Sequence, residues 1–287
     1  MSKANYPLLL RPHLAERVWG GNRLGDGIGE AWDLSVHPNG PCTIENGALA
    51  GRTLADVSAK TPDDFGGAID LLAKRLDAKQ DLSVQVHPKK GADSKTEAWI
   101  VLQSDRGAGV YHGFSQPIEA DALRDKATDG SLPEVMQFVQ VRPGQCVFVP
   151  SGTVHAIGAG LFLFEIQQSA DVTYRLFDWG RGRELHLEQG VACSDLNGAP
   201  PLPPARPQSD GSLRLVECDH FRVDRMDSHK PFHVEPGDRW TAVLVVAGSV
   251  AVDDIDAQPG QTVLLPTAAG ARTFSPSPCC TALIYGP

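Results

Sequence analysis

Three polar residues in the first half of the chain have the types and spacing of metal ligands. Gln85 and His87 lie in the stretch DLSVQVHP, which has the composition of a strand. Because alternate residues of a strand face the same side, both side chains can point in one direction. Glu97 follows after a Pro–Lys–Lys–Gly loop, at the expected start of the next strand. The spacing therefore brings an amide, an imidazole and a carboxylate within reach of one centre, although Gln85 could also be an ordinary strand amide.

A fourth donor, His155, follows a stretch rich in turn residues. Gly144, Pro150, Gly152 and His155 have the spacing G-x5-P-x-G-x2-H, which resembles the second conserved motif of cupins. The first glycine permits a tight turn, and the Pro–Gly bend after the strand can direct the histidine inward. With the three upstream residues it supplies two nitrogen and two oxygen donors. Such a set suits a catalytic Zn²⁺, and iron or manganese could use similar ligands.

Cationic side chains near these donors could hold an anionic substrate. Arg175 lies in TYRLFDWGR, after an expected strand, and its planar guanidinium could contact substrate oxygens in pairs. It could instead form a surface or structural ion pair with Asp171 or Asp178. Lys95, two residues before Glu97, suits a phosphate group as a point charge or could be a solvated lysine. Arg181 is a weaker phosphate candidate, since WGRGRE also reads as a turn.

A carboxylate outside the ligand set could move a proton. Glu165 opens EIQQ on the strand that follows the His155 turn, so it can share the interior with the metal ligands. It is the first choice as a general base. The alternatives are Asp171 and the carboxylate of the ligand set, and Glu165 could instead bond structurally to the backbone.

The elements expected around these residues are mostly short strands. The chain has 29 glycines and 22 prolines spread between short runs of β-branched and aromatic residues, a pattern that favours a sandwich or barrel. The strand runs are 43–44, 83–87, 99–102, 147–149, 161–166, 242–246 and 263–265. Helical spacing is predicted at 63–76, 118–128 and 132–138.

A proline-rich stretch and an internal echo suggest two related domains. Residues 197–208, NGAPPLPPARPQ, hold five prolines and read as a linker. The PGQ that begins PGQCVFVPSG at 143–152 recurs in PGQTVLLPTA at 259–268, which indicates one barrel on each side of the linker or a chance likeness of two hairpins. We expect a metal-binding domain at 1–196 and a smaller β domain without a metal site at 209–287.

Composition excludes some classes of function. The 287 residues carry a net charge of −9, which argues against a basic nucleic-acid footprint but allows a locally basic pocket. No apolar run approaches the roughly 20 residues of a membrane helix, and no segment resembles a secretion signal. We therefore expect a cytoplasmic protein, with no prediction of its oligomeric state.

The order of these motifs resembles that of a known enzyme family. The chain resembles the type I phosphomannose isomerases, in the short bacterial form within the cupin superfamily. The matching stretches span most of residues 7–195: RVWGGNRLG, GEAWDLSVHPNG, LLAKRLDAKQDLSVQVHP, KTEAWIVL, VFVPSGTVHAIGAG and EIQQSADVTYRLFDWGR. The resemblance implies two cupin-type jelly-roll barrels with a few short helices in the N-terminal part. After about residue 209 the likeness is loose.

The resemblance also implies an activity and the roles of several residues. It implies one zinc ion per chain held by Gln85, His87, Glu97 and His155, with Arg175 as the active-site arginine. Ser83 and Lys95 match positions that the family places beside the substrate. The implied reaction interconverts mannose 6-phosphate and fructose 6-phosphate through a cis-enediol. Two alternatives remain open: a non-catalytic sugar-phosphate-binding or regulatory cupin, and a metal cupin of another reaction class such as a dioxygenase.

Overall fold

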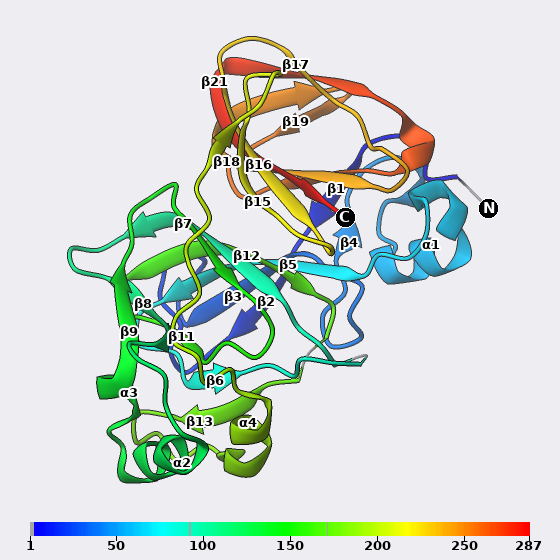
Figure 1. Cartoon of the computed structure of the whole chain (residues 1–287). Helices are drawn as coiled ribbons and strands as arrows, with labels where there is room; N and C mark the ends of the chain where they lie inside the picture. Colours follow the sequence, from blue (N-terminus) through cyan, green and yellow to red (C-terminus); the bar gives the residue numbers. More distant parts are fainter. Residues whose placement is uncertain (1–2, 92, 171) are drawn as a thin grey trace. The chain divides into compact units, whose positions relative to one another are not determined.

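The chain forms two compact units, each assembled from separated stretches of sequence. The computed structural model describes residues 3–91, 93–170 and 172–287 (Figure 1). One unit contains the residues up to Leu14, Ala31–Lys74 and Pro204–Pro287, and the other contains Ala15–Glu30 and Arg75–Pro203. The chain was expected to divide once, at 197–208, with 1–196 in one domain. The structure instead divides the first 74 residues between the two units.

The first unit is built on one large antiparallel sheet. Its N-terminal strand β1 pairs with β20 near the C-terminus, with Leu8 opposite Leu264, which explains why early residues join this unit. The strand order is β14 (Arg206–Pro207), β15 (Leu213–Glu217), β16 (Arg222–Ser228), β21 (Arg272–Gly286), β18 (Thr241–Val252), β20 (Thr262–Leu265), β1 (Leu8–Arg11) and β4 (Thr43–Ile44). Strand β17 (Phe232–Val234) pairs with β21, and β19 (Ile255–Ala257) pairs with β18. The helical elements of this unit are η1 (Gly47–Leu49), α1 (Leu54–Lys60), η2 (Pro62–Phe65) and η3 (Thr267–Ala269).

Two further sheets consist mostly of residues of the second unit. The six-stranded sheet has the order β10 (Cys146–Val149), β7 (Glu97–Ser104), β12 (Leu161–Gln168), β5 (Leu71–Ala78), β3 (Ile28–Leu34) and β2 (His13–Glu16). The five-stranded sheet has the order β13 (Tyr174–Phe177), β6 (Val84–Val86), β11 (His155–Ile157), β8 (Gly109–Phe114) and β9 (Met136–Gln140). The helices of this unit are α2 (Ala120–Asp129), α3 (Leu132–Val135) and α4 (Leu187–Cys193).

Alternation along these strands separates two hydrophobic layers. Trp99, Val147, Val110 and Ile157 belong to one buried cluster, which draws on both sheets and fills the space between them. Their strand neighbours on the opposite face of the five-stranded sheet, such as Val84, Val86 and Ala156, pack in a second cluster with residues of α2 and α4. The same alternation places Gln85, His87, Glu97 and His155 on the inner side, so the polar site shares the interior with an apolar core.

The prediction of a mainly β fold with a few short helices is confirmed. Each strand run identified from sequence falls on a strand, although Ser83 and His87 lie just outside β6, and the helices expected near 118–128 and 132–138 appear as α2 and α3, with β9 replacing the end of the second. Closed barrels are not observed: within the described parts of the chain, none of the three sheets closes on itself.

The predicted helix at 63–76 was wrong. The chain makes only the 3-10 turn η2 there, and the central strand β5 follows. Gly66 and Gly67 end the turn with φ angles of 69° and 122°, values that favour glycine. Seven of the eight residues of β5 are buried. A strand buried on both faces reads as a nearly continuous apolar run, which periodicity does not distinguish from a buried helix.

The PGQ echo corresponds to two turns with the same hydrogen bonds. Gly144 and Gly260 have φ angles of 86° and 85°. The N–H of Gly144 donates to Val101 O at 2.8 Å, and the N–H of Gly260 donates to Val245 O at 2.7 Å. In each turn the glutamine side chain accepts a bond from the backbone three residues earlier, at 2.7 Å and 2.8 Å. The two turns therefore share their backbone conformation and hydrogen bonds as well as their sequence.

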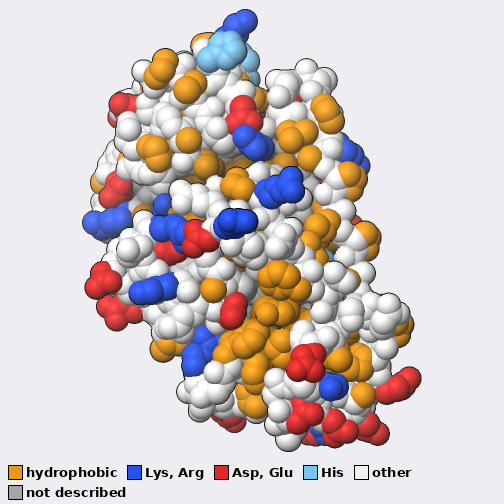
Figure 2. All heavy atoms as spheres, turned by 90° about the vertical axis from the view of Figure 1, so that its left-hand side faces the viewer, with side chains coloured by type: hydrophobic (Ala, Val, Ile, Leu, Met, Phe, Trp, Pro, Cys, Tyr) orange, Lys and Arg blue, Asp and Glu red, His pale blue; other side chains and the backbone are white. Residues whose placement is uncertain are grey.

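Hydrophobic and charged side chains share the face drawn in Figure 2. Hydrophobic groups gather over part of it, and both signs of charge are interspersed around them. Phe138 is 41% exposed, and its ring contacts Tyr111, which also contacts Trp179. Tyr111 and Trp179 pack against the outer cluster of the five-stranded sheet, so these rings lie on the face away from the polar interior. In the described residues, no helix has both the length and the apolar character needed to cross a membrane.

Candidate functional site

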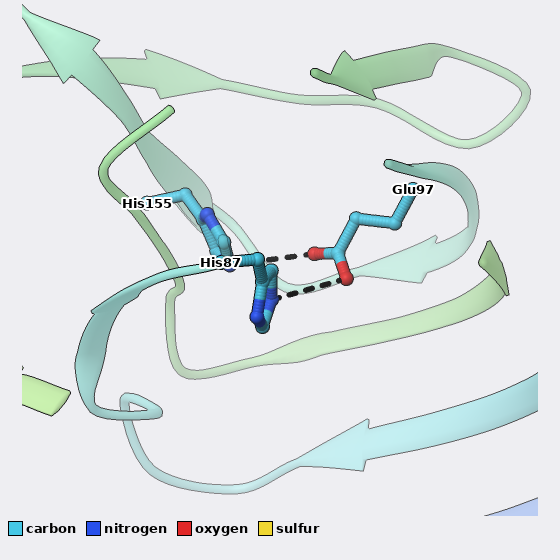
Figure 3. A group of neighbouring side chains, drawn as sticks. All are labelled: His87, Glu97 and His155. Carbon is cyan, nitrogen blue, oxygen red and sulfur yellow. Dashed lines mark ion pairs between the residues drawn. The ribbon is translucent and has the colours of Figure 1, made fainter. Parts of the chain in front are cut away.

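Neighbouring strands bring the predicted metal donors to one place. Gln85 lies in β6, and His87 follows its end; His155 opens β11 directly opposite Gln85. Glu97 opens β7 in the facing sheet, where it pairs with Val149 at the end of β10. The Pro150–Gly152 turn then returns the chain to the five-stranded sheet. Figure 3 shows the side chains of His87, Glu97 and His155 turned toward one another.

Three of these side chains form a tight buried cluster. Nε2 of His87 lies 3.4 Å from Glu97 Oε2, and Nε2 of His155 lies 3.3 Å from Glu97 Oε1. All three side chains are only 1% exposed. One donor atom from each residue lies within 4.8 Å of the others. Two imidazole nitrogens and one carboxylate at this separation can surround a single cation.

Outer hydrogen bonds orient both imidazoles. His87 Nδ1 lies 2.9 Å from Val172 O, and His155 Nδ1 lies 2.8 Å from Thr153 O. A carbonyl can only accept, so each Nδ1 carries the proton and each Nε2 keeps a lone pair directed at the cluster. Metal-binding histidines have this arrangement, in which a second bond fixes the tautomer. The site therefore fits a metal ion by its donor types and by their orientation.

Gln85 and Ser83 lie beside this cluster. The Gln85 amide nitrogen is 3.4 Å from His155 Nε2, and Ser83 donates to the amide oxygen at 3.3 Å. Coordination through the oxygen of Gln85 would require the amide to turn over. The structure thus places Ser83 in contact with a predicted ligand.

Burial controls the charge state of the histidines. Desolvation lowers the pKa of His155 from 6.5 to about 3, and burial followed by the nearby Lys95 charge lowers the pKa of His87. Both rings are therefore neutral at pH 7, as metal coordination requires. Burial alone would raise the pKa of Glu97, but Lys95 together with the neighbouring His87 and His155 outweighs it and holds that pKa well below its usual range.

Lys95 is a buried member of the cluster. Its Nζ lies 2.8 Å from Glu97 Oε2 and 3.3 Å from His87 Nε2. Burial would lower its pKa, yet the Glu97 charge and then the Glu165 charge raise it above the usual value. Lys95 and Glu97 therefore form a buried ion pair.

The predicted base, Glu165, also faces the interior. It lies on β12 opposite Trp99 on β7 and is 4% exposed. The indole N–H of Trp99 donates to Glu165 Oε2 at 3.0 Å. The ring of Trp99 also contacts His155, with centroids 5.4 Å apart. Trp99 therefore links the predicted base to a predicted ligand. Asp171, the alternative base, lies outside the described residues.

The two predicted arginines differ in their surroundings. Arg175 lies on β13 opposite Gln85, and its Nη1 donates to Glu184 O at 2.8 Å. Its buried Nε has no hydrogen-bond partner among the described residues. Arg181 instead bonds to the Asp178 carboxylate at 2.9 Å and to Asp81 O at 2.8 Å. The guanidinium of Arg181 is thus held by protein acceptors within the described residues.

Two further residues near the site were not singled out from the sequence. Gln167 is fully buried opposite Glu97, and its Oε1 accepts no bond from the described residues. The two-residue spacing from Glu165 could have indicated it. Glu30, 8% exposed and 3.0 Å from Arg17, is near enough to raise the pKa of Lys95. No spacing rule connects Glu30 to the distant donors.

Comparison with known proteins identifies the family. Residues 23–106 match the family described as phosphomannose isomerase type I, catalytic domain. The chain is 32% identical to the mannose-6-phosphate isomerase of Streptococcus mutans, over 91% of this chain and 92% of that protein. It is 34% identical to mannose-6-phosphate isomerase ManA of Bacillus subtilis, over 76% of this chain and 78% of the relative. The chain belongs to the type I phosphomannose isomerase family.

The fold agrees with that of solved members of the family. The crystal structure of mannose 6-phosphate isomerase from Bacillus subtilis aligns with a TM-score of 0.90 at 26% identity, covering 98% of this chain and 100% of that one. The structure of a protein from Archaeoglobus fulgidus, described as a putative mannosephosphate isomerase, aligns with a TM-score of 0.81 at 19% identity. The family resemblance of the sequence motifs is thereby confirmed.

Proposed function

We propose that the chain is a zinc-dependent aldose–ketose isomerase that interconverts mannose 6-phosphate and fructose 6-phosphate. One observation carries the proposal: a buried cluster of two oriented imidazoles and a carboxylate lies in a chain of the phosphomannose isomerase family. An isomerase of this kind must stabilise negative charge on a carbonyl oxygen while a proton moves between neighbouring carbons.

The metal would be held by His87, Glu97 and His155, with Gln85 as the fourth ligand. These are four protein ligands, one more than catalytic zinc sites usually have, so a substrate oxygen would bind as a fifth ligand. A bound zinc ion supplies Lewis-acid polarisation of the substrate carbonyl. The two Nδ1 hydrogen bonds to backbone carbonyls support this assignment, because they keep both rings oriented and neutral.

Glu165 would carry the proton between C1 and C2 through a cis-enediol. Its burial on the inner face beside the cluster supports this role, and the bond from Trp99 holds one carboxylate oxygen in place. General-base catalysis requires such a fixed carboxylate within hydrogen-bond reach of the substrate.

Arg175 and Lys95 would hold the anionic groups of the substrate. Arg175 lies on the strand next to Gln85, and its Nε makes no hydrogen bond within the described structure, so the guanidinium retains donor capacity. Lys95 brings a positive charge next to Glu97 and Glu165. We assign Ser83 to positioning Gln85, and Arg181 to the structural bonds described above.

The proposal also covers the relationship of the fold to cupins and the cellular compartment of the protein. The two sheets that face each other around the site, and the two matching PGQ turns, support a cupin-type origin for both halves of the chain. A metal site in the first half alone, with 209–287 free of metal, is part of this proposal. All six cysteines are unpaired, which suits the reducing cytoplasm.

A coupled assay tests the activity. Purified protein is supplied with mannose 6-phosphate, and fructose 6-phosphate formation is followed, with glucose 6-phosphate and free mannose as comparison substrates. We expect turnover of mannose 6-phosphate and at least about tenfold lower kcat/KM on the others. No turnover by zinc-loaded protein, together with binding of mannose 6-phosphate, would instead support a non-catalytic sugar-phosphate-binding protein.

A further inference from the structure

The Lys95 ammonium and a metal ion would need the same atom of His87. Lys95 can only donate hydrogen bonds, so its contact at 3.3 Å uses the lone pair of His87 Nε2. The Nδ1 of the same ring is committed as a donor to Val172 O at 2.9 Å. A neutral imidazole has one lone pair, and a metal must bind through it. The two partners therefore exclude each other at this nitrogen.

Charge balance leads to the same competition. Glu97 is 1% exposed, and the ammonium of Lys95, 2.8 Å away, is the cation paired with it in the described structure. A divalent metal bound to Glu97 would supply that neutralising charge itself. It would also repel an ammonium held this close.

We propose that Lys95 is the resident cation of the metal-free centre, and that its ammonium must leave His87 before a metal can bind. The proposal rests on the metal centre proposed above. In the metal-free chain Lys95 neutralises Glu97 and keeps the two imidazoles in place. In the loaded chain the same ammonium is displaced from His87 Nε2, so metal binding and the position of this charge are one event.

The experiment compares Lys95→Met with the wild type in two measurements. Zinc affinity is measured by competition with a chromophoric chelator, and the thermal midpoint is measured with and without zinc. Lys126→Met is the matched control, because it also removes one ammonium that makes a side-chain hydrogen bond, on α2 and outside the cluster. We expect Lys95→Met to bind zinc at least about tenfold more tightly. Its metal-free midpoint should fall by about 5 °C or more, since Glu97 loses its buried partner.

The outcomes separate this proposal from the metal centre itself. Unchanged or weaker zinc affinity in Lys95→Met, with the wild type binding one zinc, would overturn the competition and leave the metal centre standing. Tighter zinc binding without any loss of metal-free stability would also overturn it, because the removal of a repelling charge would then explain the tighter binding. A wild-type chain that binds no zinc would overturn both.

A measurement on the wild type decides the question if the variant does not fold. A buried, bonded ammonium should give a slowly exchanging ¹⁵N–H signal in the metal-free chain. The Lys95 signal should shift or vanish at one equivalent of zinc. A signal that stays unchanged through the titration would overturn the proposal.

Discussion

Replacing Glu97 by glutamine should strongly destabilise the metal-free protein. The substitution keeps the shape of the side chain but removes the charge that faces Lys95 at 2.8 Å. At an effective dielectric constant of about 20, two unit charges at that distance attract each other by about 6 kcal/mol. Part of this attraction offsets the cost of burying both ions. Removing one partner of a buried pair is therefore expected to cost about 3–5 kcal/mol.

Urea denaturation in the presence of a chelator measures this loss. The double variant Glu97→Gln with Lys95→Met should be more stable than the sum of the single losses predicts, because no unpaired charge remains. The folded pKa of Glu97 lies below its usual value, so its stabilising contribution is present above that usual value and is lost as the pH falls through the folded pKa. A loss below about 1 kcal/mol at pH 7, or strict additivity of the two substitutions, would refute the ion pair as the stabilising element.

Three other predictions follow from the site. Arg175→Lys should lower turnover by about 100-fold with zinc content unchanged, because the planar fork is lost; near-normal turnover would assign that arginine a structural role. Glu165→Gln should lower turnover and exchange of the C2 hydrogen with solvent by about 100-fold or more while zinc is retained. Persistent exchange would reject this base, and lost zinc would reveal a ligand instead. His155 has a pKa of about 3 against 6.5 unfolded, so the unfolded chain binds its proton first. As the pH is lowered between those values, the free energy of unfolding of the metal-free protein should therefore decrease by up to about 1.4 kcal/mol per pH unit. His155→Gln should reduce this slope, and an unchanged slope in the variant would contradict the assignment.

Local pattern was sufficient to predict most of the candidate site. The two-residue spacing of Gln85 and His87 and the turn chemistry before His155 both depend on contacts within one strand or one turn. The structure keeps these relationships and brings Glu97 to the same centre. Such features survive in any fold that buries one face of the strand.

The remaining features depend on contacts between distant segments. The entry of residues 8–11 into a C-terminal sheet arises from pairing with β20, which no local signal encodes. Because β5 is buried on both faces, its hydrophobic pattern did not distinguish a strand from a helix. The position of Lys95 between Glu97 and His87 depends on a rotamer that spacing does not determine. The nearness of Glu30 to Lys95 likewise required the structure.

Titration of the chelated protein with zinc tests the central claim most directly. Isomerase activity on mannose 6-phosphate is measured after each addition, alongside the metal bound per chain. The structure predicts no activity without metal, a linear rise, and saturation at about one zinc per chain. His87→Ala with His155→Ala should neither bind this zinc nor gain activity. Full activity in the rigorously metal-free wild type, or saturation only well above one equivalent, would contradict a single catalytic metal held by this cluster.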